Sequence, residues 1–290
     1  MICSLSILMV FHFSIFDKLE ARPMISEEIG MRFMFFKNDS RLLERYNISV
    51  LADKPFVVFV HGFQSSPEIW RTAEVRQTLV ERMDVNVILV DWSKWSQVNN
   101  YEIAVIRSHI VAAYLANWLS TLHDQRVIKD YDNVTLIGHS LGAHIVGIAG
   151  RMLDSRIKRI IALDPAMPGF GNDSGNNGVN VDSGQFVMVL HTATMLLGLK
   201  EPIGHVDFYF NGGMLQPSCD YKSTFDKLIC SHSKATEYLI KSLKNPTKYL
   251  AYKCHTLENC ENMINDLNEP TIYMNITIPI TTRGLYSVVT

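Results

Sequence analysis

The stretch "NVTLIGHSLGAHIVGIAG", residues 133–150, places one serine between two glycines, at the point where a strand-like run meets a helix-like run. Val134–Ile137 is short and almost wholly apolar, which is typical of a strand buried on both faces. From Gly142 onward, apolar residues recur with the spacing of one helix face. Between them, Gly138–Gly142 has the form G-x-S-x-G, and its glycines let a strand and a helix approach without Cβ clashes.

This turn predicts an exposed nucleophile. A serine between strand and helix is forced into a strained backbone conformation, and the hydroxyl of Ser140 is expected to project beyond the carboxyl end of the sheet. The free N–H groups at the start of the following helix would point at the same place and stabilise an anion that forms there.

A serine hydroxyl is a weak nucleophile at neutral pH and needs a base that an acid orients. After a turn of this kind the acid and then the histidine follow along the chain. Asp164 ends the next predicted strand, Ile157–Leu163, and Pro165 prevents the strand from continuing, so the carboxylate is expected at the sheet edge. A turn or capping role is the alternative for an aspartate before proline. Asp91 also ends a predicted strand, but it precedes the serine.

Spacing alone does not select the base from the four histidines that follow Asp164. These are His191, His205, His232 and His255. His191 ends a predicted strand and His205 begins one, so either could be a buried, hydrogen-bonded histidine. His232 lies close to a cysteine and just before a helical pattern, where a base carried by a loop is expected.

The remaining chain predicts an α/β fold. Further apolar runs read as buried strands: Phe56–Val60, Val87–Val90, Ile160–Leu163 and Phe186–Leu190. Residues 66–83 predict a helix capped by Ser66 with Pro67 at its first position. Residues 101–122 predict a largely buried helix, because apolar residues recur at three- or four-residue spacing, at Ile103, Ile106, Ile110, Ala113, Ala116, Leu119 and Leu122. Alternating strands and helices indicate a mostly parallel central sheet flanked by helices.

The last residues alternate between apolar and polar, with Ile272, Met274, Ile276 and Ile278 on one face. The sequence "TTRG" then precedes Leu285–Val289. This pattern predicts a terminal β-hairpin. No internal boundary isolates a second domain.

Composition and the amino-terminal residues predict a secreted globular protein. The 290 residues are 47% hydrophobic and 19% charged, and the net charge of −2 gives no electrostatic reason to expect nucleic acid as a partner. Residues 2–16 are nearly all apolar but too short to span a bilayer, so residues 1–22 are predicted to be a leader and 23–290 a single domain, without a transmembrane segment. Five N-glycosylation sequons fit secretion, at Asn38, Asn47, Asn133, Asn172 and Asn275.

Four cysteines remain once a leader with Cys3 is removed. They are Cys219, Cys230, Cys254 and Cys260. In a secreted chain they are expected to form disulfides, whereas in a cytosolic chain they would be buried free thiols. None has the spacing of a zinc site with histidine partners, and no metal or cofactor is predicted.

The chain resembles the animal pancreatic-type lipase family, which includes triacylglycerol lipases, lipoprotein lipases, secreted phospholipases A1 and insect yolk-protein relatives. The matching segments, in family order, are "FVHGF" (59–63), "DW" (91–92), "GHSLGAH" (138–144), "LDPA" (163–166), "LHT" (190–192), "GHVDFYFNGG" (204–213) and "CSHSKA" (230–235). The resemblance implies the α/β-hydrolase fold and hydrolysis of lipid esters at an interface. It implies Ser140 as nucleophile, Asp164 as acid and His232 as base, with the backbone N–H groups of Phe63 and Leu141 as the oxyanion hole.

The sequence departs from the family pattern in three places. We expect a single domain without the carboxyl-terminal β-sandwich that many members carry. In the segment that binds calcium in some relatives, Asn180 and Ser183 replace the expected aspartates, so no structural calcium is predicted. Only five residues separate Cys254 and Cys260, fewer than in the family, and their pairing is left open.

The resemblance also favours a substrate class. A bridge between Cys219 and Cys230 would close a short lid beside His232, and the second covering segment, between His191 and His205, is short as well. In the family, phospholipases A1 show two short covers, so release of the sn-1 acyl chain from phospholipids is expected. The alternatives are a triacylglycerol lipase and, less favoured, a non-enzymatic lipid carrier like the yolk proteins, a branch that lacks the nucleophile.

Overall fold

The computed structural model describes residues 31–37, 41–42, 54–171, 177–264 and 271–290. These residues form one central sheet with the strand order β10-β9-β11-β8-β7-β6-β5-β3-β4-β1-β2. The strands are β1 (Arg32–Lys37), β2 (Arg41–Leu42), β3 (Phe56–Val60), β4 (Asn86–Asp91), β5 (Val134–His139), β6 (Arg159–Leu163), β7 (Val187–His191), β8 (Val206–Phe210), β9 (Leu250–Cys254), β10 (Thr271–Tyr273) and β11 (Gly284–Val288). The α-helices are α1 (Trp70–Arg82), α2 (Ser93–Ser96), α3 (Tyr101–Asp124), α4 (Leu141–Met152), α5 (Thr224–Lys244) and α6 (Leu257–Glu261).

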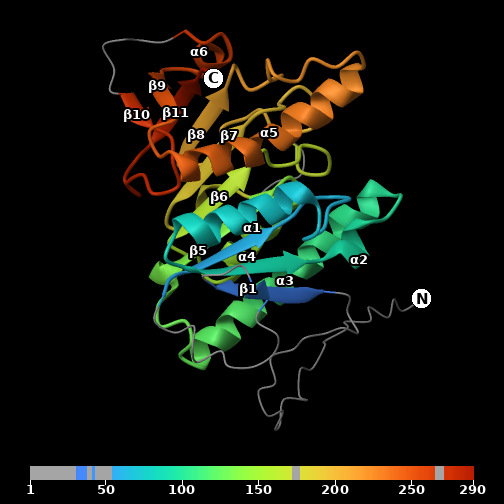
Figure 1. The fold of residues 1–290 in the computed structure, drawn as a ribbon, viewed down its shortest axis with the longest axis vertical. Coiled ribbons are helices and arrows are strands. Elements are labelled where there is room, and N and C mark those ends of the chain that lie inside the picture. The colour runs from blue at the N-terminus through green and yellow to red at the C-terminus, as the bar shows by residue number, and fades with distance from the viewer. Residues whose placement is uncertain (1–30, 38–40, 43–53, 172–176, 265–270) are drawn as a thin grey trace, which may run out of the picture.

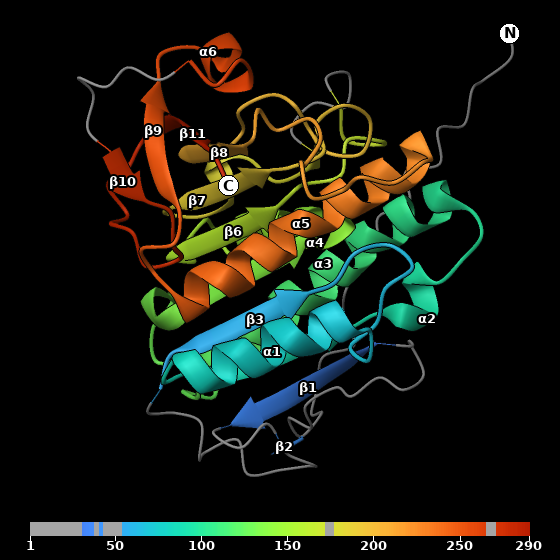
Figure 2. The ribbon, with the colours of Figure 1, turned by 45° about the horizontal axis from the view of Figure 1, so that its top comes forward.

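The centre of the sheet is parallel and its edges are antiparallel. From β4 through β3, β5, β6, β7 and β8 to β11, each neighbouring pair is parallel. Strands β1 and β2 at one edge, and β9 and β10 at the other, are antiparallel to their neighbours. Helices α1 and α5 cover one face and α3 and α4 the other (Figures 1 and 2), so every residue of β3 and β7 is buried. The predicted α/β-hydrolase architecture is confirmed.

The first predicted helix starts later than expected. Helix α1 begins at Trp70, not at Ser66. The Ser66 hydroxyl accepts a hydrogen bond from Glu68 N at 3.3 Å, and its carbonyl accepts one from Ile69 N at 3.3 Å. Ser66 and Pro67 therefore form a turn that leads into the helix, because the same side-chain acceptor that caps a helix also closes a short turn.

The buried face of α3 matches the predicted one only toward the end of the helix. Ala116, Leu119 and Leu122 are buried as predicted, whereas the predicted positions in the first half are not. Ile106 is 65% exposed, and Ile103 and Ile110 are also exposed. Small residues such as Ala104, Ser108 and Ala112 are fully buried instead, where α3 packs beside α4. Apolar residues lie on several sides of α3, so periodicity could not select the buried face. Close packing against another helix favours small side chains.

Among the described helices, only α3 is long and apolar enough to cross a membrane by length and composition.

The two terminal strands do not form the predicted hairpin. Strand β10 pairs with β9, and β11 lies between β9 and β8. The predicted alternation is nevertheless observed in burial, because Met274, Ile276 and Ile278 are buried in the cluster beneath α5. Residues 274–283 cross that cluster outside any strand. The apolar pattern thus predicted which side chains are buried, but it did not predict which strands pair with each other.

Two disulfides join the four cysteines, and they include the Cys254–Cys260 pairing that the sequence left open. Cys219 pairs with Cys230, and Cys254 pairs with Cys260. The first bridge closes a segment with a sequence separation of 11 residues, which in the chain-entropy account stabilises the fold by about 3 kcal/mol. The second joins the end of β9 to α6. Cys3, the predicted leader and the sequons at Asn38, Asn47 and Asn172 lie outside the described residues.

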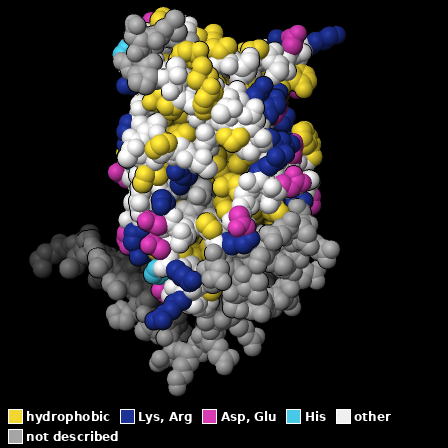
Figure 3. All heavy atoms as spheres, turned by 60° about the vertical axis from the view of Figure 1, so that its left-hand side comes forward, with side chains coloured by type: hydrophobic (Ala, Val, Ile, Leu, Met, Phe, Trp, Pro, Cys, Tyr) yellow, Lys and Arg dark blue, Asp and Glu magenta, His cyan; other side chains and the backbone are white. Residues whose placement is uncertain are grey.

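Charged side chains are mixed in sign on the face drawn in Figure 3. Lysine and arginine side chains are interspersed there with aspartate and glutamate, and hydrophobic side chains lie between them. This distribution agrees with the small net charge of the sequence.

Candidate active site

Ser140 is the one residue between the end of β5 and the start of α4. Its φ of 57° and ψ of −122° lie in a region that residues with a side chain seldom adopt. The two flanking glycines have no room for a side chain. A Cβ on Gly138 would lie 2.1 Å from the carbonyl oxygen of Gly142, and a Cβ on Gly142 would lie 2.2 Å from that of Val60. The strained strand-to-helix turn predicted from the sequence is confirmed.

Asp164 follows β6 directly and is fully buried. One carboxylate oxygen, Oδ1, accepts hydrogen bonds from the backbone N–H groups of Thr192 at 2.7 Å and Ala193 at 3.1 Å. The other oxygen, Oδ2, lies 2.6 Å from Nδ1 of His232. The carboxylate is held on one side by the backbone and bonded on the other to the ring, so the Nδ1 proton is directed at Asp164 and Nε2 is left as the acceptor.

His232 lies within α5, not on a loop as the sequence suggested. The helix begins at Thr224, eight residues earlier, and Ser223 caps it by accepting a hydrogen bond from Asp226 N. The cap lies inside the segment that the Cys219–Cys230 bridge closes. The predicted lid therefore includes the first turn of α5, and the disulfide joins this helix to the preceding chain.

His139 is the last residue of β5, the strand next to β6, and it forms a hydrogen bond with the backbone of His232. Its Nε2 donates to the carbonyl oxygen of His232 at 2.9 Å, and the two rings are 4.7 Å apart. The pKa of His139 is lowered to about 3, mainly by burial and to a lesser extent by repulsion from the nearby His232 ring. His139 is therefore neutral at physiological pH and serves as a hydrogen-bond donor to α5.

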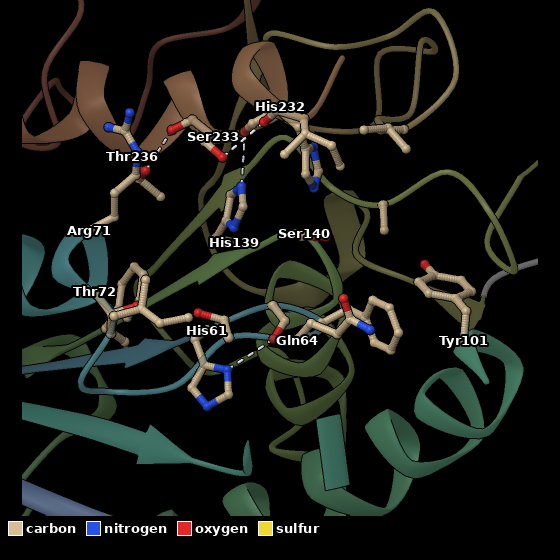
Figure 4. A pocket seen from close by; sticks show the side chains of 18 of the residues that line it. His61, Gln64, Arg71, Thr72, Tyr101, His139, Ser140, His232, Ser233 and Thr236 are labelled. Atoms are coloured by element: carbon tan, nitrogen blue, oxygen red, sulfur yellow. Dashed lines mark hydrogen bonds between the residues drawn. The ribbon is translucent and has the colours of Figure 1, made fainter. Parts of the chain in front are cut away.

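Ser140 and His232 line one cavity of about 680 Å³ (Figure 4). Among the hydrogen bonds of the described residues, none joins the Ser140 hydroxyl to His232. In catalytic pairs without substrate this contact is often long and tightens when substrate binds. The cavity is thus where the hydroxyl and the imidazole can meet a ligand.

Both residues that were predicted to form the oxyanion hole belong to segments next to Ser140. Leu141 is the first residue of α4, and the N–H groups of a first helical turn have no partner within the helix. Phe63 lines the cavity and follows Gly62, where an added Cβ would lie 2.8 Å from the Cβ of Ser140. The turn that carries Phe63 is therefore in contact with the serine, and Leu141 follows the serine directly in the chain.

The close contact at Gly62 makes a testable prediction. The Gly62→Ala variant should lose about 100-fold in kcat on a soluble ester, because the new methyl group must displace Ser140 or the turn that bears Phe63. Steady-state kinetics with a chromogenic ester would measure the loss. Gly171→Ala is the matched control, since a Cβ there has no neighbour closer than 3.7 Å. Wild-type kinetics for Gly62→Ala would contradict this geometry.

The other titratable residues considered from the sequence have different partners. Asp91 bonds to Arg32 and to Ser93 N. His191 is fully buried, with Leu199 O at 2.9 Å and Asp207 Oδ1 at 2.8 Å from its ring nitrogens. His205 Nδ1 accepts from Val187 N at 3.0 Å, and His255 does not line the cavity.

The segment that corresponds to the calcium site of some relatives does not fit a cation. Arg151 donates through Nη1 to the Gly178 carbonyl and, at 3.0 Å, to the Ser183 hydroxyl. The Asn180 side chain accepts from Asp182 N at 2.9 Å. A guanidinium group already lies among the oxygen atoms that a cation would need. Among the described residues, no group of three or more histidine, cysteine or acidic side chains could hold a metal ion.

Several cavity residues were not identified from the sequence. Trp70, Arg71 and Thr72 enter from the first turn of α1, and Tyr101 enters from the start of α3. No sequence motif identified these residues. Each lies in a helix, and helical periodicity predicts only which face is buried in the core. They lie at the first residues of α1 and α3, at the ends of these helices that border the cavity.

Comparisons with known proteins agree with this architecture. The family model described as Lipase matches residues 13–263. Lipase member H of Rattus norvegicus is 32% identical over 246 residues, which cover 81% of this chain and 53% of that protein. Lipoprotein lipase of Rattus norvegicus is 34% identical, covering 72% of this chain and 48% of that protein. The chain therefore spans about half the length of these relatives. On the extent of the family match and the level of identity, the chain belongs to the lipase family.

Proposed function

We propose that this protein is a secreted serine hydrolase that cleaves carboxylic ester bonds of lipids, with Ser140, Asp164 and His232 as its catalytic triad. One observation carries the proposal. The 2.6 Å contact between Asp164 Oδ2 and His232 Nδ1 leaves Nε2 as a proton acceptor at the cavity that holds the strained serine. Membership of the lipase family and the two disulfides support the substrate class and the secreted location.

The reaction follows from these positions. His232 Nε2 removes the proton from Ser140 Oγ as that oxygen attacks the ester carbonyl, and the N–H groups of Phe63 and Leu141 receive the developing negative charge. The imidazolium then protonates the leaving alcohol, and an acyl-serine remains. A water molecule, deprotonated by His232, attacks the acyl carbonyl, and the imidazolium returns a proton to Ser140 Oγ as the bond to the serine breaks and the fatty acid leaves. The Asp164 carboxylate orients and stabilises the imidazolium in both steps.

Within this class, the covering segments favour a phospholipase A1. The lid is limited to the short segment that the Cys219–Cys230 bridge closes, and its Phe225 and Ile229 line the cavity while remaining 66% and 44% exposed. A short cover leaves room for a bulky, polar head group beside the acyl chain. Leu228, in the same segment, is buried and does not line the cavity.

The proposal is tested with purified protein and two lipids. Mixed-acyl phosphatidylcholine and triacylglycerol are supplied separately, and the released fatty acids are identified by mass spectrometry. Release of the sn-1 acid alone from phosphatidylcholine is the expected result. Equal or greater activity on triacylglycerol would indicate a triacylglycerol lipase instead. No activity on either lipid, from protein with a cooperative thermal unfolding transition, would favour a lipid carrier.

A further inference from the structure

Arg71 is the only permanently charged side chain among the described residues that line the active-site cavity. The other polar lining groups are neutral side chains and histidines. In Figure 4, Arg71, Thr72, Ser233, Thr236 and His139 gather on one side of Ser140, and Tyr101 lies on the other. The cavity is therefore polar and cationic on one side of the nucleophile.

The charge of Arg71 is only weakly compensated. Its Nη1 lies 3.3 Å from Glu237 Oε2. The same carboxylate has closer partners, since Lys234 Nζ lies 2.7 Å from Oε2 and Lys241 Nζ lies 2.6 Å from Oε1. Three cations thus share one carboxylate, which leaves the cluster with an excess of two positive charges. Burial opposes ionisation of Glu237, but these lysines outweigh it and lower its pKa to about 2, so the carboxylate is ionised throughout the physiological range.

The guanidinium group is positioned to bind an anion. It lies over the Trp70 ring at 4.9 Å, and its side chain is only 26% exposed. Among the described residues, only Nη1 has a hydrogen-bond partner, so the remaining N–H donors are available. The neighbouring Thr72 hydroxyl, on a residue 5% exposed, has no hydrogen-bond partner among the described residues. An arginine fork beside a hydroxyl is suited to the oxygen atoms of a phosphate.

We propose that Arg71 is a specificity-determining residue that binds the phosphodiester of a glycerophospholipid while the scissile ester lies at Ser140. This assignment rests on the proposed function and adds the residue that distinguishes phospholipids from neutral acylglycerols. The acyl chain then lies on the opposite side of the cavity, where the Tyr101 ring lies edge-on to Phe63 at 5.1 Å and its hydroxyl donates to the Pro168 carbonyl at 3.1 Å.

The test compares two monomeric substrates with the same acyl chains, dibutanoyl phosphatidylcholine and dibutanoylglycerol. Both are used as dissolved monomers, so adsorption to an interface does not affect the rates. Phosphatidylcholine has no net charge, so the comparison reports local contact with the phosphate. The Arg71→Gln variant should lower the ratio of the two kcat/KM values, phospholipid over diacylglycerol, by about 10- to 100-fold, the range expected for charge-assisted hydrogen bonds. Arg71→Lys should restore part of the ratio, since it keeps the charge but not the fork.

Lys241→Gln is the matched control. Like Arg71→Gln, this variant removes one positive charge that is bonded to Glu237. Lys241 does not line the cavity, so the ratio of the two kcat/KM values should stay within about twofold of the wild-type value. If wild type hydrolyses both substrates and Arg71→Gln leaves the ratio unchanged, the assignment of Arg71 is wrong and the proposed function stands. An equal fall in Arg71→Gln and Lys241→Gln would also overturn the assignment. Wild type that hydrolyses neither substrate overturns the proposed function and this assignment together.

Discussion

The Ser140→Ala variant is expected to lose about a million-fold in kcat on any ester that the wild type hydrolyses, because no other group in the proposed triad can form the acyl intermediate. The fold should be retained. The hydroxyl has no hydrogen bond to Asp164 or His232 in the structure, and alanine keeps the Cβ that already occupies the strained turn. Single-turnover kinetics would measure the loss, and thermal unfolding would show that the variant is folded.

Ser242→Ala is a suitable control for the nucleophile. Ser242 is also a buried serine, and its hydroxyl donates to the Leu239 carbonyl at 2.8 Å within α5, away from the cavity. It should lose a hydrogen bond and some stability while keeping its kcat. Activity in Ser140→Ala within tenfold of the wild type would exclude Ser140 as the nucleophile.

The Asp164→Asn variant is expected to lose about 10⁴-fold in kcat with little change in KM. The two backbone N–H groups that bond to Oδ1 would hold the amide oxygen of asparagine in that position. The amide nitrogen would then replace Oδ2 and donate to His232 Nδ1. That reverses the tautomer, so Nε2 carries the proton and can no longer accept one from Ser140. The measurement is kcat across neutral pH on a soluble ester.

The chain contains a matched control for this substitution. Asp207 is equally buried, lies 2.8 Å from His191, and accepts from the N–H groups of Ile203 and Gly204. Asp207→Asn should therefore destabilise the fold to a similar extent but leave most of the activity when both variants are assayed below their unfolding temperatures. Equal losses of kcat in the two variants would indicate that Asp164 stabilises the fold but has no separate role in catalysis.

Only some of the site could be predicted from the sequence. The turn at Ser140 was predictable because a strand, a G-x-S-x-G and a helix lie within eighteen residues, and short-range sterics determine their joint conformation. Asp164 was predictable because carboxyl ends of neighbouring parallel strands meet at one edge of a sheet. His232 could not be selected by spacing, and its place within α5 was missed because the cap at Ser223 lies inside the lid.

Long-range packing decided the rest. Strand β9 inserts between the two terminal segments and replaces the expected hairpin, and α4 determines which side of α3 is buried. Arg71 lines the cavity from the first turn of α1, and α5 brings Glu237 beside it. These contacts join residues up to 166 positions apart, and no local pattern encodes them.

By itself, the sequence determined the fold class, the strained position of Ser140 and the order in which the acid and the histidines follow it, since each depends on neighbouring residues or on strand polarity. His232 was named as the base by the family resemblance and not by any local pattern. Tertiary structure alone decided which strands pair at the sheet edge and which charged side chain enters the cavity. These features depend on packing contacts between side chains of elements that are far apart in the sequence. Such contacts form only in the folded chain, so no local sequence pattern predicts them.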